Sequence, residues 1–200
     1  MPRILTKIKD LNGEFETFLT EPYRQKNKTK GEKMKKTTQL VRYTARGAVI
    51  AALYVVLTAF SAMLGLSSGV IQLRVSEALC ILPIFMPEAV PALFVGCFLS
   101  NLLVSGGVIW DVIFGSIATL IGALGTRALR HLPDKLLWLA ALPPVISNAV
   151  IVPFVLIYAY GVPDTYWFIM LTVAIGEILS VGAFGSMLYF GIKKSKLQIK

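Results

Sequence analysis

The chain has 200 residues, of which 56% are hydrophobic, a mean hydropathy of +0.70 and a formal net charge of +9. These values exclude an ordinary soluble domain. A single membrane domain of five or six short helices accounts for the whole length, which leaves no room for a second folded domain. Twelve of the twenty Lys and Arg residues precede Gly47 without any nucleic-acid-binding motif, so the charge indicates membrane orientation rather than nucleic-acid binding.

Residues 1–38 are polar and rich in Lys, Glu, Thr and Asn, which predicts a poorly ordered or loosely amphipathic cytoplasmic segment. Met34 is followed by two lysines and then by the first apolar stretch, a common beginning for a compact membrane protein. We therefore expect residues 1–33 to be an over-long start or a dispensable extension. Residues 39–194 are then the membrane domain and residues 195–200 a basic cytoplasmic tail.

Three long stretches carry no charged residue: 47–73, 89–110 and 136–163. A helix of a soluble core shows a polar face every second turn, and these stretches do not, so we interpret them as membrane-spanning. The second predicted helix is short and bounded by Pro83 and Pro87, which favours a half-span or a steep, broken helix. The sequence thus predicts an all-α integral membrane protein with helices at 41–64, 75–86, 88–105, 109–130, 136–160 and 165–191.

The first predicted helix has small residues four apart on two adjoining stripes, Gly47 with Ala51 and Ala48 with Ala52. Such spacing lets helix backbones approach closely in lipid. On this helix it fits either internal packing or a docking face for another membrane protein. In the fourth helix, where internal packing is the natural interpretation, the same device recurs as Gly115, Ala118, Gly122, Ala123, Gly125 and Thr126.

The loop charges predict the topology. The N-terminal segment, the loop after the fourth helix and the C-terminus carry Lys and Arg, which places them in the cytoplasm, whereas the connectors 65–68, 105–108 and 161–165 carry neither. An even number of crossings must then separate Arg42 from Arg127. Segments two and three either both cross or form a re-entrant hairpin together with a crossing. We predict six crossings of a bacterial cell membrane with both termini in the cytoplasm.

Six polar side chains lie in or at the ends of these helices, where each costs a few kcal/mol and needs a partner or a function. Four of them lie at the predicted outer ends, and the other two near the middle of the last two helices. They predict a polar pocket that opens outward, reaches the midplane and is walled by Phe, Tyr and Trp. Such a pocket suits a small planar heterocycle with N–H donors. The predicted substrate-binding residues are Arg74, Glu77, Asn101, Asp111, Asn148 and Glu177.

Most of these residues have a structural alternative. Arg74 and Glu77 are spaced for a local ion pair. Asp111 is placed to cap its helix, and Asn148 to form an interhelical hydrogen bond. Glu177 has no Lys or Arg within ten residues on its own helix, so a functional role is its better interpretation.

Motifs for catalysis, metal binding or nucleotide binding are absent from the sequence: it has no phosphate-binding loop, no H-E-x-x-H and no Ser–His pairing. The single histidine, His131, lies in a predicted cytoplasmic loop. Cys80 and Cys97 lie in apolar helices as small buried hydrophobes, and Glu88 is expected to cap the third helix. We expect no enzyme activity, no cofactor and no metal, and any uphill transport to use an ion gradient or a partner that hydrolyses ATP.

Several sequence blocks are distinctive: Arg-Val-Ser-Glu-Ala-Leu at 74–79, within 71–79, and Asp-Val-Ile-Phe-Gly-Ser at 111–116, within 111–120. With Leu82-Pro83, 90–97, 142–149 and Gly176-Glu177, they resemble the queuosine precursor transporter family from about Met34 to Lys194.

The resemblance implies a substrate-capturing S component of an energy-coupling factor (ECF) transporter. Such a six-helix protein binds a vitamin-like molecule and docks on a transmembrane coupling subunit that carries two ATPase subunits. The implied substrate is a queuosine precursor, a 7-deazaguanine or queuine. The docking face of S components matches Ala48 and Ala52, and Gly47 and Ala51 offer the same spacing one step away. Glu177 with Asn148 is then the first choice for the guanine-like edge.

Two other hypotheses stay open beside this one. A self-sufficient proton-coupled carrier of a small heterocycle would use Glu177 as a titrating group within the membrane. A structural or assembly membrane protein would bind no ligand. An S component for another vitamin is a variant of the leading hypothesis.

Overall fold

The computed structural model describes residues 34, 36–66, 72–104, 106 and 108–195. It divides into two units, Met1–Tyr43 and Thr44–Lys200, and the described part of the first is helical. The predicted N-terminal extension, residues 1–33, and the last five residues of the predicted tail lie outside the described residues. The second unit contains the helical bundle.

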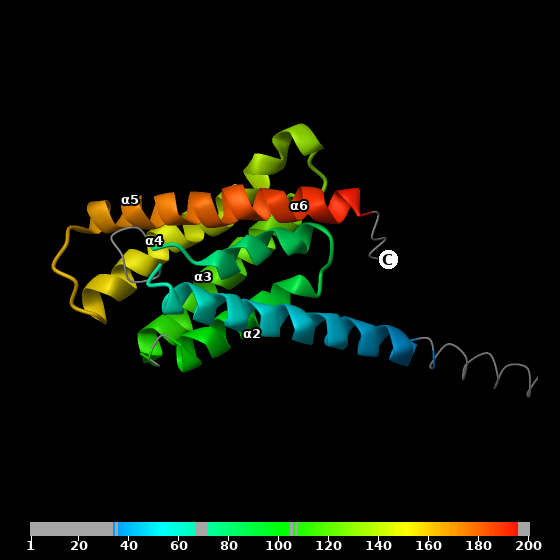
Figure 1. Cartoon of the computed structure of the whole chain (residues 1–200), viewed down its shortest axis with the longest axis horizontal. Helices are drawn as coiled ribbons and strands as arrows, with labels where there is room; N and C mark the ends of the chain where they lie inside the picture. Colours follow the sequence, from blue (N-terminus) through cyan, green and yellow to red (C-terminus); the bar gives the residue numbers. More distant parts are fainter. Residues whose placement is uncertain (1–33, 35, 67–71, 105, 107, 196–200) are drawn as a thin grey trace, which may run out of the picture. The chain divides into compact units, whose positions relative to one another are not determined.

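The described residues form helices and no strands, which confirms the predicted all-α class (Figure 1). Short 3₁₀ helices and one π-helical turn join or interrupt the α-helices, and the last three elements form one continuous rod. Helix ends differ from the predicted ones by a few residues. The elements are the first helix Lys36–Met63, η1 Val75–Ile84, α2 Ala89–Leu103, α3 Ile109–Ala128, η2 Asp134–Ala141, α4 Leu142–Tyr158, α5 Tyr166–Glu177, η3 Ile178–Phe184 and α6 Gly185–Lys194.

Four apolar helices are long enough to cross a membrane: Lys36–Met63, Ile109–Ala128, Trp138–Tyr158 and Tyr166–Lys194. The two others are shorter. At the usual rises, η1 is about 20 Å long and α2 about 22 Å, less than the roughly 30 Å of a hydrocarbon core. The chain is a multi-pass membrane protein.

The second predicted helix is the 3₁₀ helix η1, and it lies inside the bundle. Every side chain from Ser76 to Pro83 is buried, and η1 packs against the first helix, α2 and η3 in the main hydrophobic cluster. Pro83 removes a backbone donor within the element, which is compatible with a short, broken helix. At its C-terminal end, Arg127 of α3 donates to the carbonyls of Pro83 and Ile84, at 2.8 and 3.3 Å.

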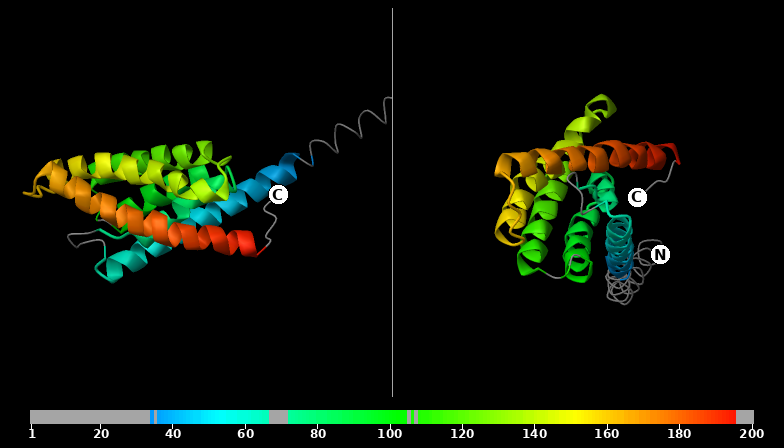
Figure 2. Two further views of the ribbon diagram at one scale, coloured as in Figure 1. Left: turned by 90° about the horizontal axis from the view of Figure 1, so that it is seen from above. Right: turned by 60° about the vertical axis from the view of Figure 1, so that its left-hand side comes forward.

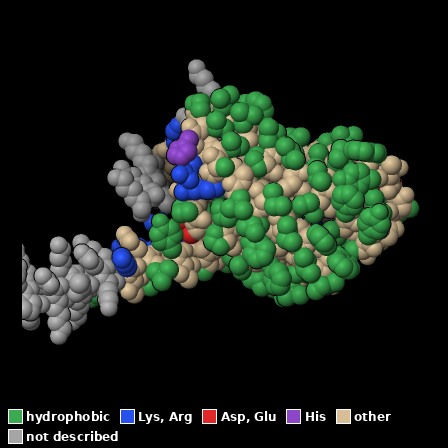
Figure 3. Space-filling view, turned by 180° about the vertical axis from the view of Figure 1, so that it is seen from behind, with side chains coloured by type: hydrophobic (Ala, Val, Ile, Leu, Met, Phe, Trp, Pro, Cys, Tyr) green, Lys and Arg blue, Asp and Glu red, His purple; other side chains and the backbone are tan. Residues whose placement is uncertain are grey.

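Basic side chains meet at one end of the bundle, called here the basic end. Arg46 contacts Glu88 at 3.4 Å at the start of α2, and Lys193 lies 6.0 Å from the ring centre of Tyr189, which packs on Phe85 at the end of η1. In Figure 3, hydrophobic side chains cover most of the visible bundle, and Lys and Arg are confined to one end.

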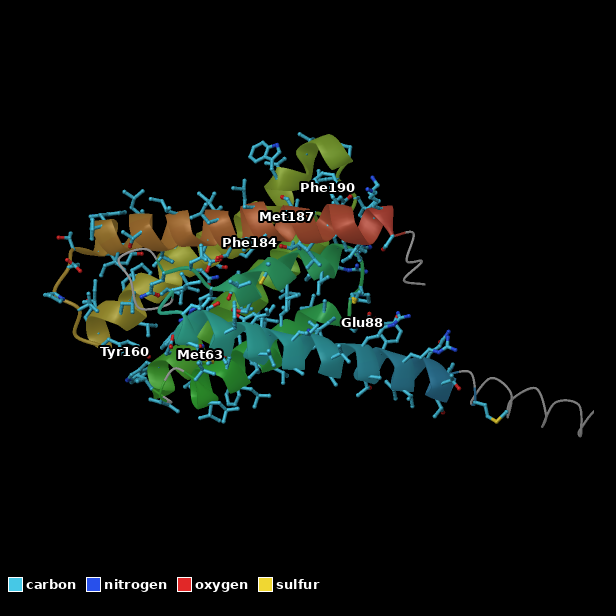
Figure 4. All side chains as sticks on the ribbon, in the orientation of Figure 1. Met63, Glu88, Tyr160, Phe184, Met187 and Phe190 are labelled. Atoms are coloured by element: carbon cyan, nitrogen blue, oxygen red, sulfur yellow. The ribbon has the colours of Figure 1, made fainter. Side chains whose placement is uncertain are left out.

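The helical segments run alternately away from and toward the basic end. The first helix, α2 and α4 run away from it, and η1, α3 and the α5–α6 rod return to it. Met63 and Tyr160 lie together at the opposite end, whereas Glu88 lies toward the basic end (Figure 4). The predicted cytoplasmic charges at Arg46, Arg127 and Lys193 therefore share one end.

Helix α3 packs between α2 and α4 through its small residues, with the helices side by side as in Figure 2. A Cβ at Gly115 would lie 2.7 Å from Asn101 Nδ2 of α2, and a Cβ at Gly122 would lie 2.6 Å from the Pro144 Cα of α4. Thr126 donates to the Ala140 carbonyl at 2.8 Å. The small residues of this helix serve internal packing, as predicted.

Candidate functional site

Two neighbouring polar cavities lie in the half of the bundle away from the basic end. The larger one, called here the end cavity, has a volume of about 370 Å³, within the size range of small-molecule sites. It lies among the last turns of the first helix, α2 and α4 and the start of α3. Its lining residues are Thr58, Ala62, Gln72, Arg74, Val104, Asp111, Val152, Leu156, Tyr160 and Val162.

The smaller cavity, called here the inner cavity, has a volume of about 10 Å³, room for about one water molecule. It shares Gln72, Arg74 and Val152 with the end cavity, so the two adjoin along that wall. Its lining residues are Gln72, Arg74, Glu77, Gly115, Thr119, Asn148, Val152, Val173 and Glu177.

Two polar atoms of the inner cavity lack a hydrogen-bond partner. They are Asn148 Nδ2, a donor, and Glu177 Oε2, an acceptor, on side chains that are 4% and 7% exposed. Elsewhere in the described residues, only Glu88 Oε2 and Ser180 Oγ share this condition. A buried polar group without a partner costs about 1–3 kcal/mol, so a donor and an acceptor left open in one cavity indicate a place for a polar ligand edge.

Glu177 is positioned by the local structure on both sides. Gly176 has no side chain, and a Cβ there would fall on the carbonyl oxygen of Gln72, so the segment that contains Gln72 runs directly over this turn. The π-helical element η3 begins at the next residue, Ile178. Single π-helical turns within α-helices are frequent at functional sites.

Glu77 is held by internal contacts at the other side of the inner cavity. The Tyr54 hydroxyl donates to Oε1, and the Cys80 thiol donates to Oε2 at 3.0 Å. Thr58, one turn along from Tyr54, donates to the Ser76 hydroxyl at 2.8 Å. Both carboxylate oxygens of Glu77 therefore already have donors, in contrast to Glu177.

Asp111 lines the end cavity beside Tyr160. The Tyr160 hydroxyl donates to Asp111 Oδ2 at 3.2 Å, and Asp111 is 5% exposed. Tyr160 follows the span that ends at Tyr158, and burial together with the Asp111 carboxylate raises the pKa of Tyr160 to about 12. The phenol is thus protonated at neutral pH and remains a donor to Asp111.

The structure also separates the predicted site residues into two groups. Arg74, Glu77, Asn148 and Glu177 meet in the inner cavity, and Arg74 meets Asp111 in the end cavity. Asn101 lines neither. It is fully buried, and its Nδ2 donates to the Asp111 carbonyl at 3.1 Å, which joins α2 to α3.

The structure does not show the local ion pair of Arg74 or the helix cap of Asp111. Arg74 forms no ion pair with a carboxylate of the described residues, and α3 begins without a side-chain cap from Asp111. Asn148 Nδ2 makes no hydrogen bond of standard geometry, but the Asn148 side chain of α4 lies close enough to Glu177 of α5 to interact with its carboxyl group. Glu88 is the N-cap residue of α2 but makes no capping hydrogen bond, because its side chain turns to Arg46.

The expected aromatic wall was wrong. Among the described lining residues only Tyr160 brings a ring to either polar cavity, and the remaining apolar wall is aliphatic. Four other aromatic side chains, Trp110, Phe114, Phe154 and Tyr158, lie on the outside of α3 and α4. There they line an apolar groove of about 560 Å³, made by Trp110, Phe114, Val150, Ile151, Phe154, Val155, Tyr158 and Ala159.

Sequence reasoning missed four polar residues of the site, Thr58, Gln72, Thr119 and Tyr160. Gln72 lies in a connector, where a polar residue is ordinary. Thr119 bonds the Gly115 carbonyl of its own helix at 3.1 Å, as threonines in membrane helices do. Tyr160 could have been predicted from its position. It lies at the predicted outer end of the fifth helix, and Asp111 lies at the outer end of the fourth helix, which is the preceding one.

The two small-residue stripes of the first helix face different surroundings. Ala51 is buried, and its Cα lies 3.2 Å from a Cβ built on Gly96 of α2, so this stripe packs inward. Ala48 and Ala52 are exposed. In the structure, Gly47 and Ala51 lie against α2, and Ala48 and Ala52 lie on the surface.

Two comparisons with known proteins give a match. Residues 44–194 match the sequence profile of a family described as "QueT transporter". The chain is similar to the queuosine precursor transporter QueT of Lactococcus lactis subsp. cremoris (strain MG1363), with 37% identity over 92 residues, 46% of this chain and 53% of that protein. The match spans about half the length of this curated relative. No solved structure matches the chain.

Proposed function

The chain belongs to the QueT transporter family, and from that premise we propose that it is the substrate-binding S component of an ECF-type, ATP-driven importer. Its substrate is a queuosine precursor, a 7-deazaguanine or queuine. Transporters are not enzymes, in agreement with the expectation from the sequence.

The observation that carries the proposal is the pair of unpartnered atoms in the inner cavity. Asn148 Nδ2 offers a hydrogen to a ring carbonyl, and Glu177 Oε2 accepts one from a ring N–H or an exocyclic amine. A guanine-like edge presents a carbonyl beside an N–H, in this order of acceptor and donor. An adenine-like edge also offers one acceptor and one donor, but it lacks the second donor with which a guanine-like edge can reach a carboxylate.

The volumes of the two cavities indicate which part of the ligand each one can hold. The end cavity, at about 370 Å³, accommodates a bicyclic ring, whereas the inner cavity, at about 10 Å³, has room only for the atoms of its edge. The ring therefore lies in the end cavity and directs its polar edge past Arg74 and Val152 toward Glu177. Its 7-substituent stays among the residues of the end cavity.

The topology supports uptake into the cell. The basic end is the cytoplasmic one by the positive-inside rule, so the end cavity opens toward the outside. In this proposal the chain crosses the membrane six times, η1 and α2 forming the short second and third crossings. Ala48 and Ala52 then form the docking face for the transmembrane coupling subunit, which carries two ATPases.

A ligand panel tests the substrate. The purified chain in lipid nanodiscs is titrated with guanine, queuine, 7-cyano- and 7-aminomethyl-7-deazaguanine, adenine, biotin and riboflavin. We expect at least one queuosine precursor to bind and to raise the melting temperature, because a ligand that favours the native state stabilises it. Exclusive binding of biotin or riboflavin would assign the chain to another vitamin.

An uptake assay tests the coupling. A host that lacks ECF subunits should accumulate no labelled precursor when it makes this chain alone, and co-expression with the coupling subunit and the ATPases should restore accumulation. Uptake by the chain alone that collapses with the proton gradient would instead establish the proton-coupled carrier.

A further inference from the structure

The charges around the two polar cavities do not balance. Their linings contain the carboxylates of Glu77, Asp111 and Glu177 and one cation, the guanidinium of Arg74. Carboxylates at such depth in a membrane protein are stable when a positive charge or a set of donors compensates them. One guanidinium can compensate one carboxylate, which leaves two acidic groups for hydrogen-bond donors of the protein or of the ligand.

Two of the three carboxylates are engaged elsewhere. Glu77 receives hydrogen bonds on both oxygens, from Tyr54 and Cys80. Glu177 lies in the inner cavity with its open oxygen beside Asn148, where the proposed function places the edge of the ring. Asp111 lines the end cavity, where the ring's substituent lies, together with Arg74, whose guanidinium interacts electrostatically with it.

Asp111 and Tyr160 together have the composition of an ammonium site. The Tyr160 hydroxyl holds Asp111 Oδ2 at 3.2 Å, which fixes the direction of the carboxylate. Tyr160 also lines the end cavity, so its ring adds an aromatic surface next to a nearly buried carboxylate. Carboxylate and aromatic ring both attract an alkylammonium group, and the attraction grows as water is excluded.

We propose that the ligand carries a protonated amine and that Asp111, oriented by Tyr160, binds this amine in the end cavity. This inference rests on the proposed function, because it describes the other end of the same ligand. Among 7-deazaguanines it selects those with an ammonium on the 7-substituent over those whose substituent is neutral. Asp111 is then the residue that determines specificity, and Glu177 with Asn148 recognises the ring that all these compounds share.

Two ligands that differ in charge at the 7-position test the proposal. The affinities of 7-aminomethyl- and 7-cyano-7-deazaguanine are measured at neutral pH on the wild-type chain and on Asp111→Asn, which keeps the size of the side chain and an acceptor for Tyr160. We expect the wild type to bind the amine about tenfold or more tightly than the nitrile. Asp111→Asn should remove most of that preference, because it should lower the affinity for the amine by a much larger factor than the affinity for the nitrile.

Two further variants separate charge from structure. Tyr160→Phe keeps the ring and releases Asp111 Oδ2, so the preference for the amine should decrease by a smaller factor. Asp164→Asn makes the same charge change at an exposed residue of the neighbouring loop that lines neither cavity, and the preference should not change.

The outcomes distinguish the inference from the proposed function. Equal or tighter binding of the nitrile by the wild type would overturn the inference and leave the proposed function standing. So would an equal loss of both affinities in Asp111→Asn. If neither 7-deazaguanine nor queuine binds the wild type, the proposed function itself fails.

Discussion

Glu177 occupies a buried position in a long apolar helix, and one of its carboxylate oxygens has no partner. A ligand N–H at that oxygen relieves the unfavourable burial, so the carboxylate contributes to binding more than to folding. Glu177→Gln should therefore weaken binding of a 7-deazaguanine by about 1.4 kcal/mol or more, tenfold in affinity. The melting temperature of the unliganded protein should stay within a few degrees of the wild-type value. Titration calorimetry and a thermal melt measure the two.

Ser180→Ala is the matched control for Glu177→Gln. Ser180 lies three residues along the same rod, is buried, and has an unpartnered hydroxyl, but it lines neither cavity. Its loss should leave the affinity unchanged. Unaltered affinity in Glu177→Gln, or an equal loss in Ser180→Ala, would remove Glu177 from the site.

Gly176 gives a second prediction at the scale of one residue. A Cβ there would fall on the Gln72 carbonyl oxygen, which belongs to the backbone and has no flexible end to move. Gly176→Ala should displace the segment 72–74, with a destabilisation of about 1–3 kcal/mol as in other overpacked sites and a weaker affinity for the ligand. Gly182→Ala is the control, because its nearest neighbour is the Ile178 Cγ2 at 3.8 Å. A wild-type melting temperature in Gly176→Ala would show that the segment adapts.

Among single residues, the sequence predicted the polar side chains that are unusual within an apolar membrane helix. Glu177 and Asn148 were identifiable because an acid or amide in an apolar helix needs a reason. Their convergence on one cavity was a hypothesis that only the packing of α4 against α5 could establish. The role of Asn101 as a link to the Asp111 backbone and the double engagement of Glu77 were not predictable, since both depend on which atoms neighbouring elements present.

Among the helices, η1 is the one whose structure the sequence pattern predicted only in part. Its apolar sequence and its two prolines indicated a short, irregular helix at the right position. Its complete burial and 3₁₀ form were not predictable. An apolar segment of a membrane protein has the same composition whether it faces lipid or the protein interior. The first helix, α3, α4 and the α5–α6 rod were predicted closely, because length and the absence of charge suffice to identify a long span.

We predict that Arg127 stabilises the C-terminal end of η1. Its guanidinium donates to the carbonyls of Pro83 and Ile84 at the end of that element, carbonyls that a helix terminus leaves without partners. Arg127→Met keeps the apolar stem and removes the donors, so we expect a loss of about 1–3 kcal/mol of stability, typical of hydrogen bonds to charged groups. A melting curve in detergent measures it.

Arg130→Met makes the same change of charge on an exposed neighbour and should leave the melting temperature unchanged. Equal melting temperatures for the two variants would show that η1 does not depend on the guanidinium.

In the molecule as a whole, the charged residues predicted the topology, and the small residues predicted which helices pack closely. The Lys and Arg residues predicted which loops share a side, and the structure brings Arg46, Arg127 and Lys193 to one end. The small residues predicted close helix contacts but not which stripe makes them, because Gly47–Ala51 and Ala48–Ala52 have the same spacing. That choice depends on the position of Gly96 on α2, which no local pattern in the first helix contains.

The exposed stripe gives the prediction that concerns the assembly. Ala48 and Ala52 are on the surface of the first helix, away from both cavities, and larger side chains there would separate this helix from a docked membrane partner. Changing both to Leu should leave the affinity for a 7-deazaguanine unchanged and reduce uptake at least about tenfold in cells that contain the coupling subunit and the ATPases. Co-purification of those subunits should decrease in parallel. Ala51→Leu serves as the contrasting variant, because its buried side chain would collide with α2 near Gly96 and lower the melting temperature instead. If the double variant binds, copurifies and transports as the wild type does, the partner docks on another face of the bundle.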